Sequence, residues 1–141
     1  MIEALRLLLD LGLVVLIWMV QLVVYPSFKY YSASDLVRWH QTYTVRITYI
    51  VMPLMTGQLL VSGFQVYTGQ SFYSVGSFML VLSLWAITFS IFVPIHGKIG
   101  SNSFIPEDLH LLEKRNWIRT FLWSLIFVWS VLEIYLSLTR P

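Results

Sequence analysis

Cysteine is absent from this chain of 141 residues, and charged side chains are scarce. Without cysteine, the protein has no disulfide bond, no thiolate nucleophile, no iron–sulfur cluster and no cysteine-ligated zinc. Aspartate, glutamate, lysine and arginine make up 11% of the residues, against about 25% in soluble domains. The formal net charge is only +2. We expect no nucleic-acid partner, because binding to phosphates requires a strongly basic surface.

Long apolar stretches take the place of the missing charge, since hydrophobic residues make up 57% of the chain. A helix needs about 20 mostly apolar residues to cross the hydrocarbon layer of a membrane. Four stretches approach or reach this length, namely residues 7–25, 47–64, 75–95 and 117–136. We therefore predict a single domain over residues 1–141, an all-α integral membrane four-helix bundle with up-down-up-down order.

The basic residues are distributed unevenly between the two ends of the predicted bundle. Of the nine lysines and arginines, all except Arg6 and Arg140 lie in or beside the first and third connections. Cytoplasmic connections of membrane proteins are enriched in these residues. The pattern predicts a multi-pass protein of the cell membrane, with these two connections in the cytoplasm and both termini on the outer side.

Prolines bear on the shape of the predicted helices. Pro26 follows the first apolar stretch, and we expect the first helix to end there. Pro53 and Pro94 lie inside the second and third stretches, where a missing backbone donor predicts a kink.

Cap signals place the starts of the second and fourth helices before the membrane. Ser34 followed by Asp35 predicts the cap of the second helix, which then enters the lipid near Ile47. Pro106, followed by two acidic residues, is typical of a first helical turn. No helix-breaking residue follows before Thr139, so one helix would run from Pro106 through the apolar stretch 117–136. We therefore predict that the fourth helix extends into the cytoplasm.

Polar and aromatic side chains recur at helical spacing near the cytoplasmic end of every predicted helix. In chain order they are Trp18, Gln21 and Tyr25; His40, Tyr43 and Arg46; Trp85, Thr88 and His96; and Asn116, Arg119 and Trp123, with Thr120 on the same stripe of the last helix. Such groups are costly in lipid unless they face one another or water. We therefore predict a shared polar-aromatic pocket at the cytoplasmic end of the bundle.

The residue types in this predicted pocket indicate chemistry on a small lipophilic molecule. His40 and His96 are the candidate acid and base, and Arg119 is the third candidate catalytic residue. Arginine and asparagine side chains are suited to holding a carboxylate, phosphate or enolate oxygen. The predicted ligand-binding residues are Gln21, Tyr25, Tyr43, Arg46, Trp85, Thr88, Asn116, Thr120 and Trp123. The aromatic lining suits a flat or isoprenoid-like ligand, which the pocket would bind or oxidise.

Other interpretations of the same residues stay open at this point. Tryptophan, tyrosine, lysine and arginine also anchor helices at membrane interfaces without any further function. A non-catalytic membrane subunit would use the long fourth helix, with Leu109 and Leu112, to dock a partner protein. A small-solute transporter would need polar groups and broken helices at the midplane, where the chain offers Pro53, Gly57 and Gln58.

The sequence predicts no cofactor and no metal site. Two histidines from different helices can ligate one haem iron, so haem held by His40 and His96 is kept as an alternative. The expected partners are the lipid bilayer, a small lipophilic ligand, and either further copies of the chain or a membrane partner protein. Gly57 and Gly63 are candidates for a close helix contact, within one chain or between copies.

Ionisable residues are sparse towards the opposite, outer end of the bundle. Arg6 lies one turn before Asp10 and is expected to pair with it locally. Gln58 and Ser62 are the only strongly polar residues between this end and the histidines. A proton path through the bundle is therefore not predicted.

Short motifs give the chain a resemblance to a known family. Tyr25-Pro26 at the end of the first span, a polar start to the second helix, and the run 116–120 (Asn-Trp-Ile-Arg-Thr) resemble the small four-helix anthrone-oxygenase-like membrane proteins. The resemblance implies a four-helix bundle and, for some members, cofactor-free oxygenation of a polycyclic aromatic. It also implies that Asn116, Arg119 and Thr120 are pocket residues. The four-helix haem-dependent protoporphyrinogen oxidases are of similar size but rely on a histidine in the first membrane helix, and this chain has none before His40.

Overall fold

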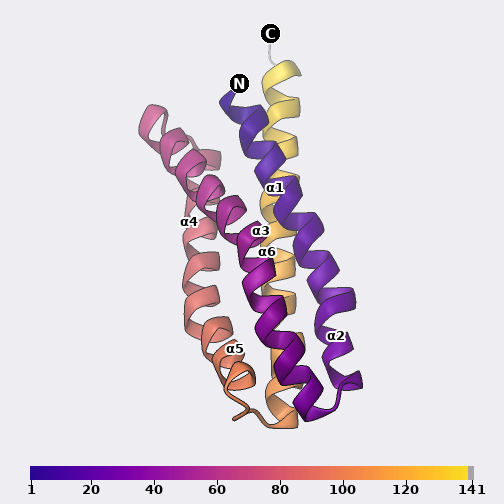
Figure 1. Ribbon diagram of the computed structural model, residues 1–141. Coiled ribbons are helices and arrows are strands. Elements are labelled where there is room, and N and C mark those ends of the chain that lie inside the picture. The colour runs from indigo at the N-terminus through magenta and orange to yellow at the C-terminus, as the bar shows by residue number, and fades with distance from the viewer. Residues whose placement is uncertain (140–141) are drawn as a thin grey trace.

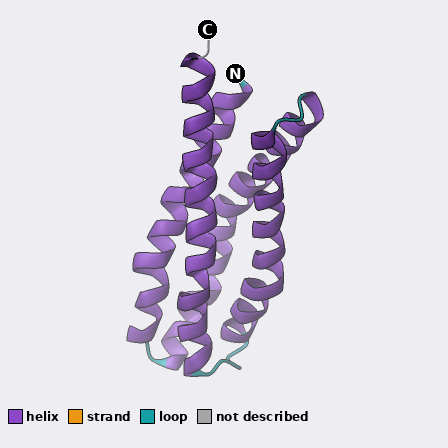
Figure 2. Cartoon of the chain, turned by 180° about the vertical axis from the view of Figure 1, so that it is seen from behind, coloured by secondary structure: helices purple, strands orange, loops and turns teal. Residues whose placement is uncertain are grey.

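The computed structural model describes residues 1–139 and shows long helices packed side by side (Figure 1). In this part of the chain every regular element is a helix, and the helices join into four rods (Figure 2). Rod 1 contains α1 (Ile2–Met19), η1 (Val20–Val24), α2 (Tyr25–Ser27) and η2 (Phe28–Tyr30). Rod 2 is α3 (Ala33–Thr68); rod 3 contains α4 (Phe72–Ile87), η3 (Thr88–Phe92) and α5 (Val93–Gly100); and rod 4 is α6 (Pro106–Thr139). The predicted all-α fold is confirmed.

Successive rods run in opposite directions, because the links between them are short. The start of α1, the end of α6 and the turn between α3 and α4 lie at one end of the bundle, called here the terminus end (Figure 1). The links 31–32 and 101–105 lie at the other, called the loop end. The α6 helix begins there roughly level with the other rods (Figure 1).

Each rod is long and apolar enough to cross a membrane. The rods contain 29, 36, 29 and 34 residues in chain order. At a rise of about 1.5 Å per residue, even the shortest exceeds the hydrocarbon thickness of about 30 Å. Large apolar side chains are also exposed on the outside of every rod, for example Val15, Leu60, Met79 and Phe121. These features are those of a multi-pass membrane protein.

Two π-helical turns shape the loop-end halves of rods 1 and 3. Rod 1 continues through Pro26 to Tyr30, so the prediction that Pro26 ends the first helix is wrong. In each rod the residue before proline donates its backbone N–H to the carbonyl five residues earlier, Tyr25 to Val20 and Val93 to Thr88. A proline ring clashes with the carbonyl of the preceding turn in a regular helix, and a wider turn relieves this clash.

The α3 helix begins at a side-chain cap, and the α6 helix begins at a proline. The α3 cap is Ser32, whose Oγ accepts the backbone N–H of Asp35 at 3.2 Å, so the predicted cap at Ser34 is two residues too late. Pro53 lies inside the continuous α3 helix. The predicted start of α6 at Pro106 is confirmed.

The rods form a closed ring in which α1 and α4 each contact both α3 and α6. Glycines allow close approach at these contacts. A Cβ atom added at Gly57 would lie 3.1 Å from Leu9, and one added at Gly76 would lie 2.6 Å from the Trp129 ring. Gly57 therefore lies at a helix contact within one chain, which is one of the two alternatives that the sequence predicted.

Candidate ligand-binding cavity and its histidine pair

A cavity of about 390 Å³ lies in the loop-end half of the bundle, between α3, rod 3 and the inner faces of rods 1 and 4. Most of its wall is apolar. The apolar lining residues are Val20, Ile47, Val51, Met52, Met55, Phe89, Phe92 and Val93. Thr48, Met52, Phe89 and Val93 are exposed on the outer surface between α3 and rod 3. The cavity therefore opens sideways, between two helices, rather than at an end of the bundle.

Arg119 supplies the only cationic side chain among the residues that line this cavity. It is 7% exposed, and its guanidinium carbon lies 4.2 Å from the Phe92 ring centroid and 5.2 Å from that of Trp123. Its Nε is buried without a hydrogen-bond partner among the described residues. The ion pairs within residues 1–139 join other side chains: Arg6 with Asp10, Arg38 with Asp35, and Lys98 with Asp108. Arg119 is thus a buried cation between aromatic rings, without a carboxylate partner in that range.

A chain of hydrogen bonds leads from the cavity towards the loop end. Tyr25 and His96 both line the cavity, and Tyr25 Oη lies 3.1 Å from His96 Nε2. The other ring nitrogen, His96 Nδ1, lies 2.7 Å from His40 Nε2, and the two imidazoles are stacked with centroids 5.0 Å apart. His40 is 1% exposed, and its Nδ1 has no partner among the described residues. One proton is shared in each link, and its position depends on the tautomers.

Gln21, Asn116 and Thr120 form a separate buried cluster that joins rod 1 to α6. Asn116 Nδ2 donates to Gln21 Oε1 at 2.9 Å, and Thr120 Oγ1 donates to the same oxygen at 3.5 Å. Gln21 Nε2 donates in turn to the backbone carbonyl of Glu113 at 3.3 Å. None of the three is among the cavity-lining residues. Their contacts hold two walls of the bundle together beside the cavity.

The structure brings most of the predicted site residues to one end of the bundle, in different roles. Those that line the cavity are Tyr25, Tyr43, Thr88, His96 and Arg119. His40 lies behind His96, and the Trp123 ring lies against Arg119. The two histidines and Arg119 therefore lie on the inner faces of their helices.

Arg46 and Trp85 do not line the cavity, although the helical spacing in the sequence predicted that they would. Arg46 is exposed, because it is one residue before the inward-facing Ile47 and so points about 100° away around α3. Trp85 is half-buried and stacks on Phe89 with centroids 5.6 Å apart, but it does not line the cavity. Trp18 likewise points outward, and its Nε1 donates to Ser124 Oγ at 3.0 Å. Both tryptophans precede a π-turn, which shifts the helix face that follows.

A second polar network, around Asp10, is richer than the sequence indicated. The predicted pair with Arg6 is present, with Arg6 Nε 3.0 Å from both carboxylate oxygens. Asp10 also accepts from Gln58 Nε2 at 2.6 Å and from Ser130 Oγ at 2.5 Å. Asp10 and Arg6 are 0% and 1% exposed. Asp10 itself was the signal of this network in the sequence, because a carboxylate in an apolar helix requires polar partners from other helices.

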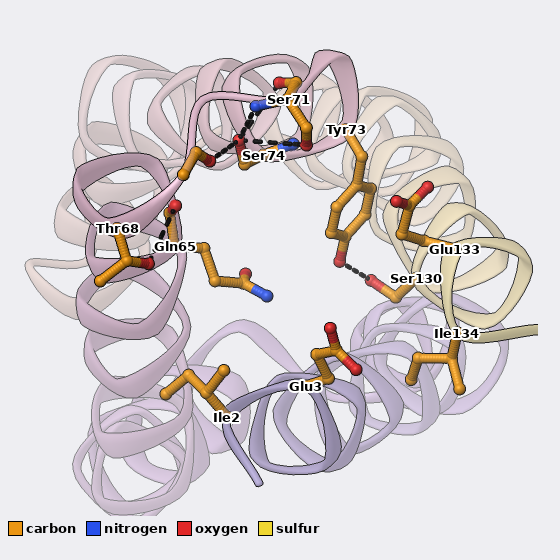
Figure 3. A pocket seen from close by; sticks show the side chains of 11 residues that line it. Ile2, Glu3, Gln65, Thr68, Ser71, Tyr73, Ser74, Ser130, Glu133 and Ile134 are labelled. Carbon is orange, nitrogen blue, oxygen red and sulfur yellow. Dashed lines mark hydrogen bonds between the residues drawn. The ribbon is translucent and has the colours of Figure 1, made fainter. Parts of the chain in front are cut away.

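The Asp10 network lies beneath a polar vestibule at the terminus end. This cavity of about 210 Å³ has Glu3 and Glu133 among its lining residues, and Figure 3 shows the Gln65 and Tyr73 side chains pointing into it. Gln65 accepts from Arg6 Nη1 at 3.2 Å, and the Tyr73 hydroxyl lies 2.7 Å from Ser130 Oγ. The vestibule therefore leads to the polar groups that hold the buried Arg6–Asp10 pair.

Trp123 connects the two polar regions. Its Nε1 donates to Gln58 Oε1 at 3.2 Å, and its ring lies beside the Arg119 guanidinium. Polar contacts thus run from Asp10 to the cavity, which the sequence did not indicate. An indole N–H only donates, so this link orders side chains but does not pass a proton.

No group of three or more metal-ligating side chains converges within residues 1–139. His40 and His96 hydrogen bond to each other directly, and their 2.7 Å separation leaves no room for a metal ion between these two nitrogens, since a single zinc–nitrogen bond is about 2 Å long. Comparisons of the chain with protein-family models, curated proteins and solved structures found no match. The resemblance to the anthrone-oxygenase-like proteins stays a prediction.

Proposed function

We propose that this chain binds a small, flat, lipophilic molecule that carries an acidic oxygen, such as a phenol or an enol, and acts on it as a membrane enzyme. The apolar part of the ligand occupies the cavity between α3 and rod 3. Its oxygen lies at the polar wall formed by Arg119, Tyr25 and His96.

The uncompensated charge of Arg119 is the observation that carries this proposal. An unpaired buried charge typically destabilises a protein by about 3–5 kcal/mol. The two neighbouring aromatic rings offset this by cation–π attraction of about 0.5–2 kcal/mol each. An anionic oxygen in the cavity would supply the missing partner through charge-assisted hydrogen bonds.

The shape of the cavity agrees with a ligand that arrives from the membrane. Its rim lies on the apolar outside of the bundle, at Thr48, Met52, Phe89 and Val93. A lipophilic molecule dissolved in the bilayer reaches this rim without crossing water. We further propose that the bound anion is the species that is oxidised, with molecular oxygen as the oxidant, in line with the cofactor-free oxygenation that the family resemblance implies.

The orientation in the membrane is part of the same proposal. The loop end contains most of the lysines and arginines and faces the cytoplasm of the cell, while both termini face outward. The first turns of α3 and α6 then extend beyond the lipid on the cytoplasmic side. The cavity is close to that side.

Titration with matched aromatic probes tests this proposal. The purified protein in lipid nanodiscs is titrated with 2-naphthol and with 2-methoxynaphthalene, and binding is followed by the change in tryptophan fluorescence. We expect 2-naphthol to bind at least about tenfold more tightly, a difference of about 1.4 kcal/mol. Arg119→Gln should abolish this preference.

Arg46→Gln is the matched control, because Arg46 is exposed and lies outside the cavity. It should leave both affinities unchanged. The proposal is refuted if 2-naphthol does not bind to the wild type, or if Arg119→Gln retains the full preference for the hydroxylated probe.

A further inference from the structure

The hydrogen-bonded chain of Tyr25, His96 and His40 connects two different environments. It begins at the hydroxyl of Tyr25, a residue of the apolar cavity wall. It ends at His40 Nδ1, about two turns from the start of α3 at the loop end. Gly100 lies next to this nitrogen, since a Cβ atom added there would be 3.9 Å from Nδ1, and the exposed turn 101–103 follows Gly100 in the chain.

We propose that Tyr25, His96 and His40 form a proton relay, which carries the acidic proton of a bound ligand from the cavity to water at the loop end. This proposal rests on the proposed function, because it assigns a step to the same ligand. The ligand is left as an anion beside Arg119. Tyr25 is the group that touches the ligand, and the two histidines act through it.

The geometry allows the relay to exist in two states that differ only in the positions of its protons. In the first, Tyr25 donates to His96 Nε2, His96 Nδ1 donates to His40 Nε2, and His40 Nδ1 carries a proton. In the second, His40 Nε2 donates to His96 Nδ1, His96 Nε2 donates to Tyr25 Oη, and His40 Nδ1 is bare. Every histidine is neutral in both states.

Transfer of one proton from the ligand converts the first state into the second. The ligand oxygen gives its proton to Tyr25 Oη as the tyrosine proton moves to His96 Nε2. The proton on His96 Nδ1 moves to His40 Nε2, and the proton on His40 Nδ1 leaves to water. The O–H bond of the ligand breaks, its electron pair stays on the oxygen, and one proton is released. The new tyrosine hydroxyl then donates to the ligand anion.

The groups around the relay favour transfer of a proton through it, without an extra proton held on either histidine. The charged or titratable groups beside it are Arg119 on α6, which lines the same cavity as Tyr25 and His96, and Tyr43 on α3, whose ring centroid lies 6.4 Å from that of His40. No carboxylate of the described residues forms an ion pair with a relay residue. The positive charge of Arg119 opposes a second positive charge on His96, so the neutral two-state scheme is the one that the site supports.

Rapid mixing with 2-naphthol tests the relay, because its neutral and anionic forms have different absorption spectra. The wild-type protein in nanodiscs, in a weak buffer with a pH indicator, should bind the probe as the naphtholate and release about one proton per bound molecule. His40→Phe keeps a ring of similar shape but removes both nitrogens. We expect proton release to slow by at least about tenfold in this variant, within the range of general acid–base contributions.

Gly100→Val supplies a second variant that leaves the cavity untouched. Its side chain would lie against His40 Nδ1, the nitrogen from which the proton leaves in this scheme, so proton release should slow while the affinity for 2-naphthol stays unchanged. Gly97→Val in the same helix is the matched control, because a Cβ atom there meets nothing within 4 Å. It should release protons at the wild-type rate.

Nitrogen-15 NMR of imidazole-labelled protein gives a readout that a purely structural role would not change. Binding of 2-naphthol should move the protonated sites from His96 Nδ1 and His40 Nδ1 to His96 Nε2 and His40 Nε2. Unchanged tautomers, a probe that stays neutral when bound, or wild-type release rates in both relay variants would overturn the relay and leave the proposed binding function standing. Absence of any binding to the wild type would refute the proposed function and the relay together.

Discussion

Replacement of Arg119 by methionine should make the ligand-free protein more stable while it weakens the binding of an acidic ligand. Methionine has a similar length and fills the space beside Phe92 and Trp123 without a charge. In the ligand-free protein, the variant no longer carries an unpaired buried cation. A binding residue is therefore expected to be a source of instability, as is common at functional sites.

The magnitude follows from two opposing contributions. Removing an uncompensated buried charge gains about 3–5 kcal/mol, whereas losing attraction to two aromatic rings costs about 1–4 kcal/mol in total. The net change lies between about −1 and 4 kcal/mol, and the midpoints of the two ranges give a stabilisation of about 1.5 kcal/mol. For a chain of this length, unfolding entropy of about 2.1 cal/mol/K per residue converts each kcal/mol into about 3–4 °C of Tm. We expect a rise of about 5 °C.

Thermal unfolding in nanodiscs, followed by tryptophan fluorescence with and without 2-naphthol, measures both effects. The probe at a hundredfold excess over its wild-type Kd should stabilise the wild type by about 2.7 kcal/mol and the variant, which binds about tenfold more weakly, by no more than about 1.4 kcal/mol. Arg46→Met is the control, since that side chain is exposed. A fall in the Tm of the Arg119 variant by a comparable amount would refute the reasoning and make Arg119 a structural residue with an adequate partner.

Two further predictions concern stability away from the cavity. Asp10→Leu leaves the Arg6 guanidinium buried without its carboxylate and should cost about 3–5 kcal/mol in the free energy of unfolding, measured by denaturant titration; a loss below about 1 kcal/mol would contradict the buried network. Gly76→Ala places a Cβ atom 2.6 Å from the Trp129 ring and should cost about 1–3 kcal/mol in the same titration. Gly97→Ala adds a methyl group in open space and should be neutral or slightly stabilising, so equal effects of the two glycine changes would contradict the packing described.

The helical architecture could be predicted from the sequence because it depends on long-range composition. Apolar stretches of sufficient length, separated by short polar links, allow few arrangements other than antiparallel rods. The start of α6 at Pro106 was also predictable, because proline and acidic residues stabilise a first helical turn whatever the rest of the fold. The Ser32 cap was missed by two residues, since neighbouring serines offer equivalent signals.

The candidate site was predictable only where regular helical spacing holds. On α3 and α6, the inward positions of His40, Tyr43 and Arg119 follow from the period of 3.6 residues. On rod 1, Trp18 was grouped with Tyr25, and the two face different ways in the structure. The rest of the Asp10 network, apart from the predicted pair with Arg6, was not predictable, because Gln58 and Ser130 come from two other helices whose relative height no local pattern fixes.

The wide turn at Val20–Val24 places the loop-end part of rod 1 in a rotational setting that an uninterrupted helix would not give. If the same residues were wound as a regular helix, Tyr25 would be rotated by about 100°, away from His96, without a change in any residue of the cavity wall beyond it. The contact between a phenol and an imidazole is thus set by the winding of a segment that contains neither group.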